Sequence, residues 1–272
     1  MLHEPEKKHL FHVHNQYDWD SINTKSDLIR KAQKILDLIP SDVQNIIDIG
    51  CGDGTLTNVL ASRYHIIGLD INLQGLARVK TLKILSTANE TPVADSTFDL
   101  VFSSELLEHL DSRIMEDTIY EMERISKKYI LITVPNNETI ERDYIKCPHC
   151  NHVFNKSYHQ RSFTKNKISV LFPNHEVIRH IEFGVGKRHY NKLLLKIKHR
   201  YSSPNSWIPK RWTGDMIRKT MCPKCLEKFE YLYQFHPVSF LCDIINLLIS
   251  PHRPYWLFVL LKSRDVRNQN HC

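Results

Sequence analysis

The chain has 272 residues, 42% of them hydrophobic and 25% charged, a composition typical of a globular protein that buries one substantial core with a small appended module. No apolar run reaches the roughly 18 residues of a membrane-spanning helix, and the N-terminus lacks the apolar core of a signal peptide, so a cytoplasmic location is expected. The net charge of +7 is compatible with an anionic partner, such as RNA, a phosphorylated metabolite or an anionic lipid surface, but does not indicate which one.

Residues 1–42 are predicted to be a helical lead-in. Ser26 and Asp27 are expected to cap a helix that carries an apolar stripe and ends near Pro40. Four histidines occupy irregular positions before this helix, and their spacing favours a solvated tail over a metal site: His3, His9, His12 and His14. Residues 265–272 are expected to form a second tail.

From Val43 onward, short β-rich runs alternate with helical segments, which predicts a parallel, doubly wound sheet with helices on both faces. Five strands come first, then a sixth at 176–183 and, after a long delay, a seventh at 256–261. The fold class is therefore α/β, with a Rossmann-like, seven-stranded, mostly parallel sheet. The first five strands are expected at 45–49, 65–70, 83–86, 99–102 and 128–134, with helices at 55–62, 74–80 and 112–126.

A glycine-rich turn at 48–54 (Asp-Ile-Gly-Cys-Gly-Asp-Gly) joins the first strand to the first helix. Glycine enters positive φ and lets backbone N–H groups approach a ligand, and the helix N-terminus adds partial positive charge. The second strand ends in Asp70, a carboxylate suited to accept hydrogen bonds from both hydroxyls of a ribose. A nucleoside-containing cofactor is therefore expected. The turn alone does not exclude a dinucleotide-binding oxidoreductase.

Two later segments, Phe-Asp at 98–99 and Leu-Glu-His at 107–109, decide between these classes. With the turn and Asp70 they make the chain resemble the class I S-adenosylmethionine-dependent methyltransferases, in the branch of ubiquinone-type and small-molecule enzymes. Thr87 stands where that family usually has an acid for the adenine amino group, a departure expected to affect affinity more than chemistry. The resemblance implies that S-adenosylmethionine is held by Asp48, Gly50, Gly52, Gly54, Asp70, Thr87, Ala88 and Ser103.

Polar residues after the fourth strand are the expected catalytic groups. Glu105, Glu108 and His109 stand at i, i+3 and i+4, and on a helix they would share one face. With His159 they look like the metal site of small-RNA 3′-terminal 2′-O-methyltransferases, which implies Mg²⁺ or Mn²⁺. The alternative is that these residues position the acceptor or move its proton without a metal.

Two cysteine pairs, Cys147-Pro-His-Cys150 and Cys222-Pro-Lys-Cys225, supply the four thiolates of a structural Zn²⁺ site. Asn151 after the first pair tolerates a left-handed turn, whereas Leu226 after the second does not. Thioredoxin-like redox chemistry is the rival interpretation. The preferred one is an inserted zinc-knuckle and helical module, built from insertions at 141–157 and 191–250 in a methyltransferase core at 43–190 and 251–264.

A basic segment at 187–201 is predicted to be an amphipathic helix, followed by Trp207, Trp212 and further cations. This mixture suits RNA, an anionic membrane surface, or a solvated helix packed on the zinc module. A second apolar helix at 240–249 is expected to pack against the core rather than a bilayer. The apolar stripe of the first helix is expected to comprise Tyr190, Leu193, Leu194, Ile197 and Tyr201.

Together these features predict an enzyme that transfers the methyl group of S-adenosylmethionine, by in-line transfer, to an oxygen of a small metabolite or sugar-type precursor. Alignment of the acceptor with the activated methyl group would supply most of the catalysis, and a general base is needed where the acceptor is a hydroxyl. Two alternatives remain: 2′-O-methylation of an RNA terminus with a divalent metal, and a non-catalytic adaptor that binds the cofactor.

Overall fold

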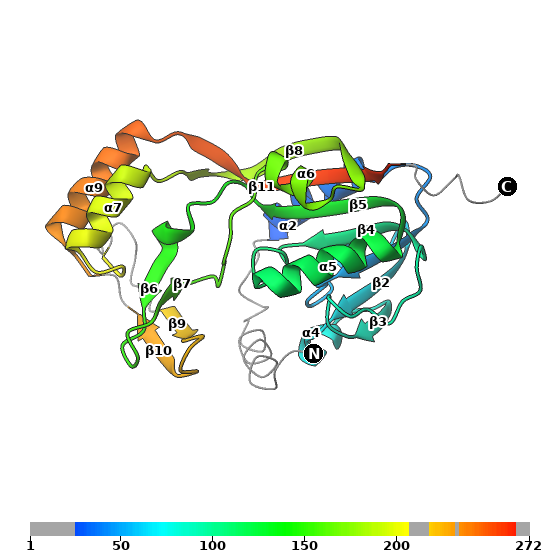
Figure 1. The fold of residues 1–272 in the computed structure, drawn as a ribbon, viewed down its shortest axis with the longest axis horizontal. Helices are drawn as coiled ribbons and strands as arrows, with labels where there is room; N and C mark the ends of the chain where they lie inside the picture. Colours follow the sequence, from blue (N-terminus) through cyan, green and yellow to red (C-terminus); the bar gives the residue numbers. More distant parts are fainter. Residues whose placement is uncertain (1–24, 207–217, 232–233, 265–272) are drawn as a thin grey trace. The chain divides into compact units, whose positions relative to one another are not determined.

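The computed structural model describes residues 25–206, 218–231 and 234–264, which form two compact units (Figure 1). The first, here called the sheet unit, comprises 25–136, 163–185 and 254–264. The second, called the cysteine unit, comprises 137–162 and the described part of 186–253. The N-terminal histidines, the tail at 265–272, Trp207 and Trp212 lie outside the described residues.

The sheet unit is built on a seven-stranded sheet of order β3-β2-β1-β4-β5-β11-β8, which confirms the predicted α/β class. The pairs β3-β2, β2-β1, β1-β4 and β4-β5 are parallel, whereas β11 runs antiparallel to β5. The chain reverses its winding between β1 and β4, the position where open α/β sheets bind ligands at the strand carboxyl ends. The strands are β1 (Asn45–Ile49), β2 (His65–Asp70), β3 (Leu82–Leu85), β4 (Phe98–Ser104), β5 (Ser126–Pro135), β8 (His175–Arg188) and β11 (His252–Ser263).

Helices flank this sheet: α2 (Lys25–Leu38), α3 (Thr55–Leu60), α4 (Leu73–Leu76), α5 (Ser112–Ile125) and α6 (Lys165–Leu171). Ile35 of α2 packs in the core with Ile46, Leu100 and Phe258 of the central strands. Asp111 begins α5 by accepting a hydrogen bond from the Ile114 N–H at 3.0 Å, a typical N-cap. Apart from the helix at 74–80, the predicted strands and helices of the sheet unit are therefore present with changed boundaries.

The predicted helix at 74–80 is wrong in length, since α4 is a single turn. Asn72 caps it by accepting from the N–H groups of Gln74 and Gly75. At its other end, Lys83 Nζ donates to the carbonyls of Leu76 (2.9 Å) and Val79 (3.2 Å). These carbonyls find a side-chain partner instead of a further helical turn.

The described part of the cysteine unit contains two β-hairpins, two α-helices and one 3₁₀ helix. The hairpins are antiparallel β6–β7 and β10–β9, and a small core of Ile145, Phe154 and Phe229 packs around the cysteines. Among the described residues, no helix is both long and apolar enough to cross a membrane. The elements are η1 (Ile140–Asp143), β6 (Tyr144–Lys146), β7 (Val153–Asn155), α7 (Lys192–Tyr201), β9 (Arg218–Met221), β10 (Lys228–Tyr231) and α9 (Pro237–Ile249).

The predicted basic helix begins later than expected, at Lys192, because Asn191 caps it and 187–188 still belong to β8. Most of its predicted apolar stripe is exposed, although Tyr190 is buried just before the helix. Leu195 and Lys198 are the buried residues of α7, whereas Leu193 and Tyr201 are 67% and 59% exposed.

The second apolar helix, α9, belongs to the cysteine unit, where it packs with α7. Its buried residues are mainly polar, and Leu241 and Leu248 are exposed. Helical spacing identifies two faces of a helix without saying which one is covered.

Candidate cofactor and metal sites

The glycine-rich turn follows β1 directly and adopts the backbone predicted for it. Gly50, Gly52 and Gly54 have φ values of 76°, 56° and 72°, in the left-handed region that disfavours a side chain. Space excludes one as well: a Cβ on Gly54 would lie 2.7 Å from Val79 Cγ2, and one on Gly50 would lie 3.0 Å from Leu106 Cδ1. The turn is thus held close to its neighbours, with β1 on one side and α3 on the other.

Asp70, at the carboxyl end of β2, is anchored to this turn. Its Oδ2 accepts the Gly52 N–H at 2.7 Å, and its Oδ1 accepts the Asn72 N–H at 2.7 Å. A carboxylate offers about four lone-pair sites, so two remain after these bonds. Asp70 is therefore oriented by backbone donors and keeps the capacity to accept two hydroxyls of a ribose.

Asp48 lies beneath the turn and is 2% exposed. Its Oδ2 accepts the Thr57 hydroxyl of α3 at 2.7 Å, whereas its Oδ1 has no hydrogen-bond partner among the described residues. Burial, with the nearby Asp70 charge, raises the pKa of Asp48 to about 7. A buried acceptor without a donor, next to a turn of three left-handed glycines, fits a cofactor that brings an amino group.

The raised pKa predicts how Asp48 affects stability. The folded-state pKa of about 7 exceeds the usual 3.8, so the folded protein binds the proton more tightly and loses stability as pH rises between these values. The side chain of Asp48→Asn cannot ionise, so this variant should not lose stability in this way. As pH rises across this window, the free energy of unfolding of the variant minus that of the wild type should increase by at most about 4 kcal/mol. Urea denaturation of both proteins at a series of pH values measures the difference. A constant difference would contradict the assignment.

The other expected cofactor residues also lie around the carboxyl ends of the strands. Thr87 and Ala88 are half-buried in the loop after β3. Ser103 is buried, and its hydroxyl donates to the Ile49 carbonyl at 2.9 Å, so it ties β4 to the end of β1. Burial raises the pKa of the Cys51 thiol, whose sulfur lies 2.8 Å from where a Cβ on Gly68 would be, as expected for a small filler.

The segment 105–110 forms turns and not the predicted helix. Glu105 has a left-handed φ of 55°, and α5 begins only after Asp111, so the i, i+3, i+4 spacing does not place three side chains on a helical face. Glu105 instead pairs with Lys31 of α2 at 3.3 Å. Glu108 is fully buried and His109 is half-buried in the same segment.

His159 belongs to the cysteine unit, where a carboxylate orients it. Its Nδ1 hydrogen-bonds Glu138 Oε2, and Lys187 Nζ donates to Glu138 Oε1 at 2.7 Å. Burial opposes ionisation of Glu138, but these two partners hold its pKa below the usual value. Sequence reasoning missed Glu138. Its position in the sequence could have indicated it, because Glu138 comes three residues after Pro135, the last residue of β5. Functional side chains often follow the carboxyl ends of strands in such sheets.

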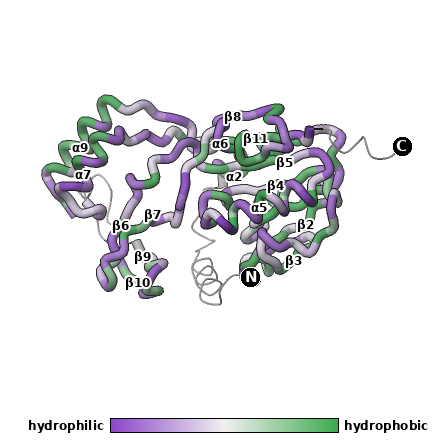
Figure 2. Tube along the Cα trace, in the orientation of Figure 1, coloured by the Kyte–Doolittle hydropathy of each residue, from purple (hydrophilic) through white to green (hydrophobic). Residues whose placement is uncertain are grey.

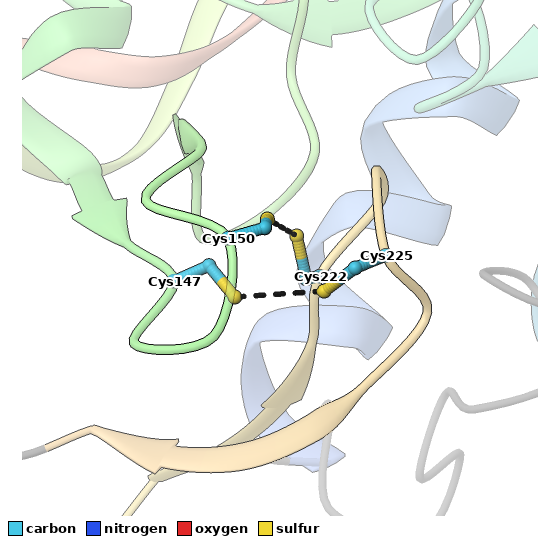
Figure 3. A group of neighbouring side chains, drawn as sticks. All are labelled: Cys147, Cys150, Cys222 and Cys225. Atoms are coloured by element: carbon cyan, nitrogen blue, oxygen red, sulfur yellow. Dashed lines mark hydrogen bonds between the residues drawn. The ribbon is translucent and has the colours of Figure 1, made fainter.

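Cys147, Cys150, Cys222 and Cys225 converge within the cysteine unit (Figure 3). Cys147 Sγ lies 3.7 Å from Cys225 Sγ, and Cys150 Sγ lies 3.5 Å from Cys222 Sγ, with all four sulfurs within 4.8 Å of one another. Four sulfurs about 2.3 Å from a tetrahedral Zn²⁺ would be separated by about 3.8 Å. The donor set and its spacing fit zinc, and none of the four is in a disulfide.

Both cysteine pairs have the same backbone. The Asn151 N–H donates to the Cys147 carbonyl at 3.0 Å, and the Leu226 N–H donates to the Cys222 carbonyl at 2.9 Å. Asn151 and Leu226 have φ values of 60° and 63°, so the expectation that Leu226 would not tolerate this turn is wrong. A left-handed leucine costs about 1 kcal/mol or more, and the matching geometry indicates that the turn is required there.

Part of the sheet unit matches a known protein family. Residues 47–129 match the family model described as a methyltransferase domain. An uncharacterized protein of Methanocaldococcus jannaschii is 33% identical over 104 residues, which cover 37% of this chain and 44% of that protein. The matched segment thus spans less than half of this relative.

Two solved structures share the fold. A S-adenosylmethionine-dependent methyltransferase from Archaeoglobus fulgidus has a TM-score of 0.52 at 16% identity, over 87% of this chain and 94% of its own. A chain from the complex of the Haloferax volcanii Trm112 methyltransferase activator has a TM-score of 0.50 at 13% identity, over 85% and 88%. Residues 47–129 therefore match a methyltransferase domain, and the chain shares the Rossmann-like fold of these solved structures.

Proposed function

We propose that this chain is an S-adenosylmethionine-dependent methyltransferase that acts on an oxygen of a small metabolite or sugar-type precursor. The supporting observation is the arrangement of Asp70, whose two oxygens are aimed by the N–H groups of Gly52 and Asn72 while two lone pairs remain. S-adenosylmethionine, when bound, supplies a methyl group already activated on a sulfonium.

The residues of the glycine-rich turn and of the strand ends would bind the cofactor and orient it. Asp70 would accept the ribose hydroxyls, and Asp48 Oδ1 would accept an amino group of the cofactor. The left-handed glycines bring backbone N–H groups close, and Thr87 and Ala88 would contact the adenine. Gly50, Gly52, Gly54 and Ser103 complete the set.

On the acceptor side, His159 is proposed as the general base for a hydroxyl. Its Nδ1 is engaged by Glu138, which assigns the basic lone pair to Nε2. Glu108 and His109 are proposed to position the acceptor. For Glu105 the ion pair with Lys31 favours a supporting role over a place among Mg²⁺ or Mn²⁺ ligands.

Zn²⁺ is proposed as a structural cofactor of the cysteine unit, held by Cys147, Cys150, Cys222 and Cys225. The hairpins that carry these residues are short, with three residues in each of β6 and β7 and four in each of β9 and β10. Two-stranded hairpins are marginally stable on their own, so a metal bond supplies cohesion that the small core lacks.

Incubation with methyl-labelled S-adenosylmethionine and a metabolite extract tests the proposed activity. The labelled methyl group is expected in small molecules and should be released by conditions that cleave methyl ethers or esters. No labelled product is expected when His159→Ala replaces the wild type. Glu182→Ala, which alters an exposed polar side chain on β8 of the sheet unit, is the control and should retain labelling. Label in an RNase-sensitive fraction would contradict the small-molecule acceptor, and no label in any fraction would contradict the activity.

A further inference from the structure

Helix α9 has an inverted amphipathic pattern. Its buried side is polar and recurs at helical spacing, with Ser239, Asp243, Asn246 and Ser250 around Cys242. Its opposite side is apolar, and Leu241 and Leu248 on that side are 60% and 80% exposed. Ordinary surface helices of globular proteins bury the apolar stripe and expose the polar one.

The buried polar residues fix this orientation because they bind α7 and its N-terminal flank. Lys198 Nζ donates to Asp243 Oδ1 at 2.8 Å and to Oδ2 at 3.1 Å, with side chains that are 2% and 3% exposed. The Tyr190 hydroxyl donates to the same carboxylate at 2.6 Å, and the Asn191 N–H donates to Asn246. Turning α9 to bury its leucines would leave a buried cation and anion without partners, which is strongly unfavourable.

The exposed side of α7 adds cations to this apolar surface. Leu193 and Tyr201 are exposed together with Lys192, Lys196 and Arg200. The one acidic residue in α7 and α9 is Asp243, which is buried against Lys198. Figure 2 shows α9 as mainly hydrophobic and α7 as mixed. The outward side chains of this α7–α9 pair are therefore mainly aliphatic and cationic, with Tyr201 added and with no exposed acid.

We propose that the α7–α9 pair docks on an anionic lipid surface. Exposed leucines enter the boundary between headgroups and hydrocarbon, and the cations of α7 meet anionic headgroups. Most of the exposed apolar side chains, Tyr201 excepted, are aliphatic and lack the flat faces on which nucleic-acid bases stack, so the surface fits lipid better than RNA. The 13 residues of α9 extend about 20 Å, less than the hydrocarbon core of about 30 Å, so the helix would lie on the bilayer.

Vesicle binding of the full chain tests this proposal. Sedimentation with phosphatidylcholine vesicles, with and without phosphatidylglycerol, should show binding that depends on the anionic lipid. Leu248→Glu is expected to lower the partition coefficient by roughly ten-fold or more, since a charge replaces a buried aliphatic group. Lys196→Gln should lower it by about five-fold, and only on the anionic vesicles.

Val170→Glu is the matched control, because Val170 is a 78% exposed aliphatic residue on α6 of the sheet unit. It should bind vesicles as the wild type does. Three outcomes would overturn the proposal: absence of wild-type binding to anionic vesicles, equal binding by Leu248→Glu, or a dimer that Leu248→Glu dissociates without any vesicle binding. RNA binding that is lost in Lys196→Gln and kept in Leu248→Glu, without vesicle binding, would assign the surface to nucleic acid instead.

Discussion

Replacing Asp70 by alanine is expected to weaken S-adenosylmethionine binding by at least about a hundred-fold. The variant removes a carboxylate proposed to accept two ribose hydroxyls, and each hydrogen bond to a charged group contributes about 1.5–3 kcal/mol. Titration calorimetry on wild type and variant gives the two Kd values. Unchanged affinity would refute the ribose assignment and, with it, the main support for the proposed function.

Asp53→Ala is the control for that measurement. Asp53 lies in the same turn, but its Oδ1 accepts from the N–H and hydroxyl of Thr55 and so serves the start of α3. Its loss should cost stability of the order of 1 kcal/mol and change the Kd only a few-fold. Because Asp70→Ala also removes the acceptor for the Gly52 and Asn72 N–H groups, its thermal unfolding must be checked alongside.

The parts of the site that sequence predicts well are those in which residue type and backbone are tightly linked. A left-handed turn against Val79 and Leu106 leaves little choice but glycine, so Gly50 and Gly54 reveal the backbone directly. The alternation of apolar runs gives the strands for a similar reason, because each central strand is covered on both faces. Asp70 follows from its place at the end of such a strand.

Features that depend on distant partners could not be predicted in this way. Lys198 and Asp243 are 45 positions apart, and only their pairing shows which side of α7 and α9 is buried. The spacing of Glu105 from Glu108 and His109 is typical of a helix. In the structure Glu105 instead lies in a turn, with a left-handed φ and an ion pair with Lys31, which is 74 positions earlier. Glu138 is similarly defined by His159 and Lys187 and not by its neighbours in sequence.

Loss of zinc is expected to unfold the hairpins of the cysteine unit. Purified protein should contain about one zinc per chain by elemental analysis, and Cys147→Ser and Cys222→Ser should each remove it, because each variant leaves three thiolates from two hairpins. Structural zinc contributes about 10 kcal/mol or more to the folding of small metal-bound domains, far more than the few buried side chains around Phe154 supply here.

Cys242→Ser separates this effect from the general cost of changing a buried cysteine. Cys242 is 4% exposed, in α9, and is not one of the four converging residues, so its variant should retain zinc. Hydrogen exchange should then be fast in β6, β7, β9 and β10 for Cys147→Ser and slow for Cys242→Ser, while the sheet unit exchanges alike in both. Zinc that is retained by both Cys147→Ser and Cys222→Ser, or that is absent from both variants and from the wild type, would rule out a shared site. The thioredoxin-like interpretation of the two cysteine pairs would then be favoured. A shared site would instead explain why two segments so far apart in sequence hold one backbone geometry. Asn151 tolerates its left-handed turn, but Leu226 is strained in the same turn, and such strain persists where the surrounding structure requires it.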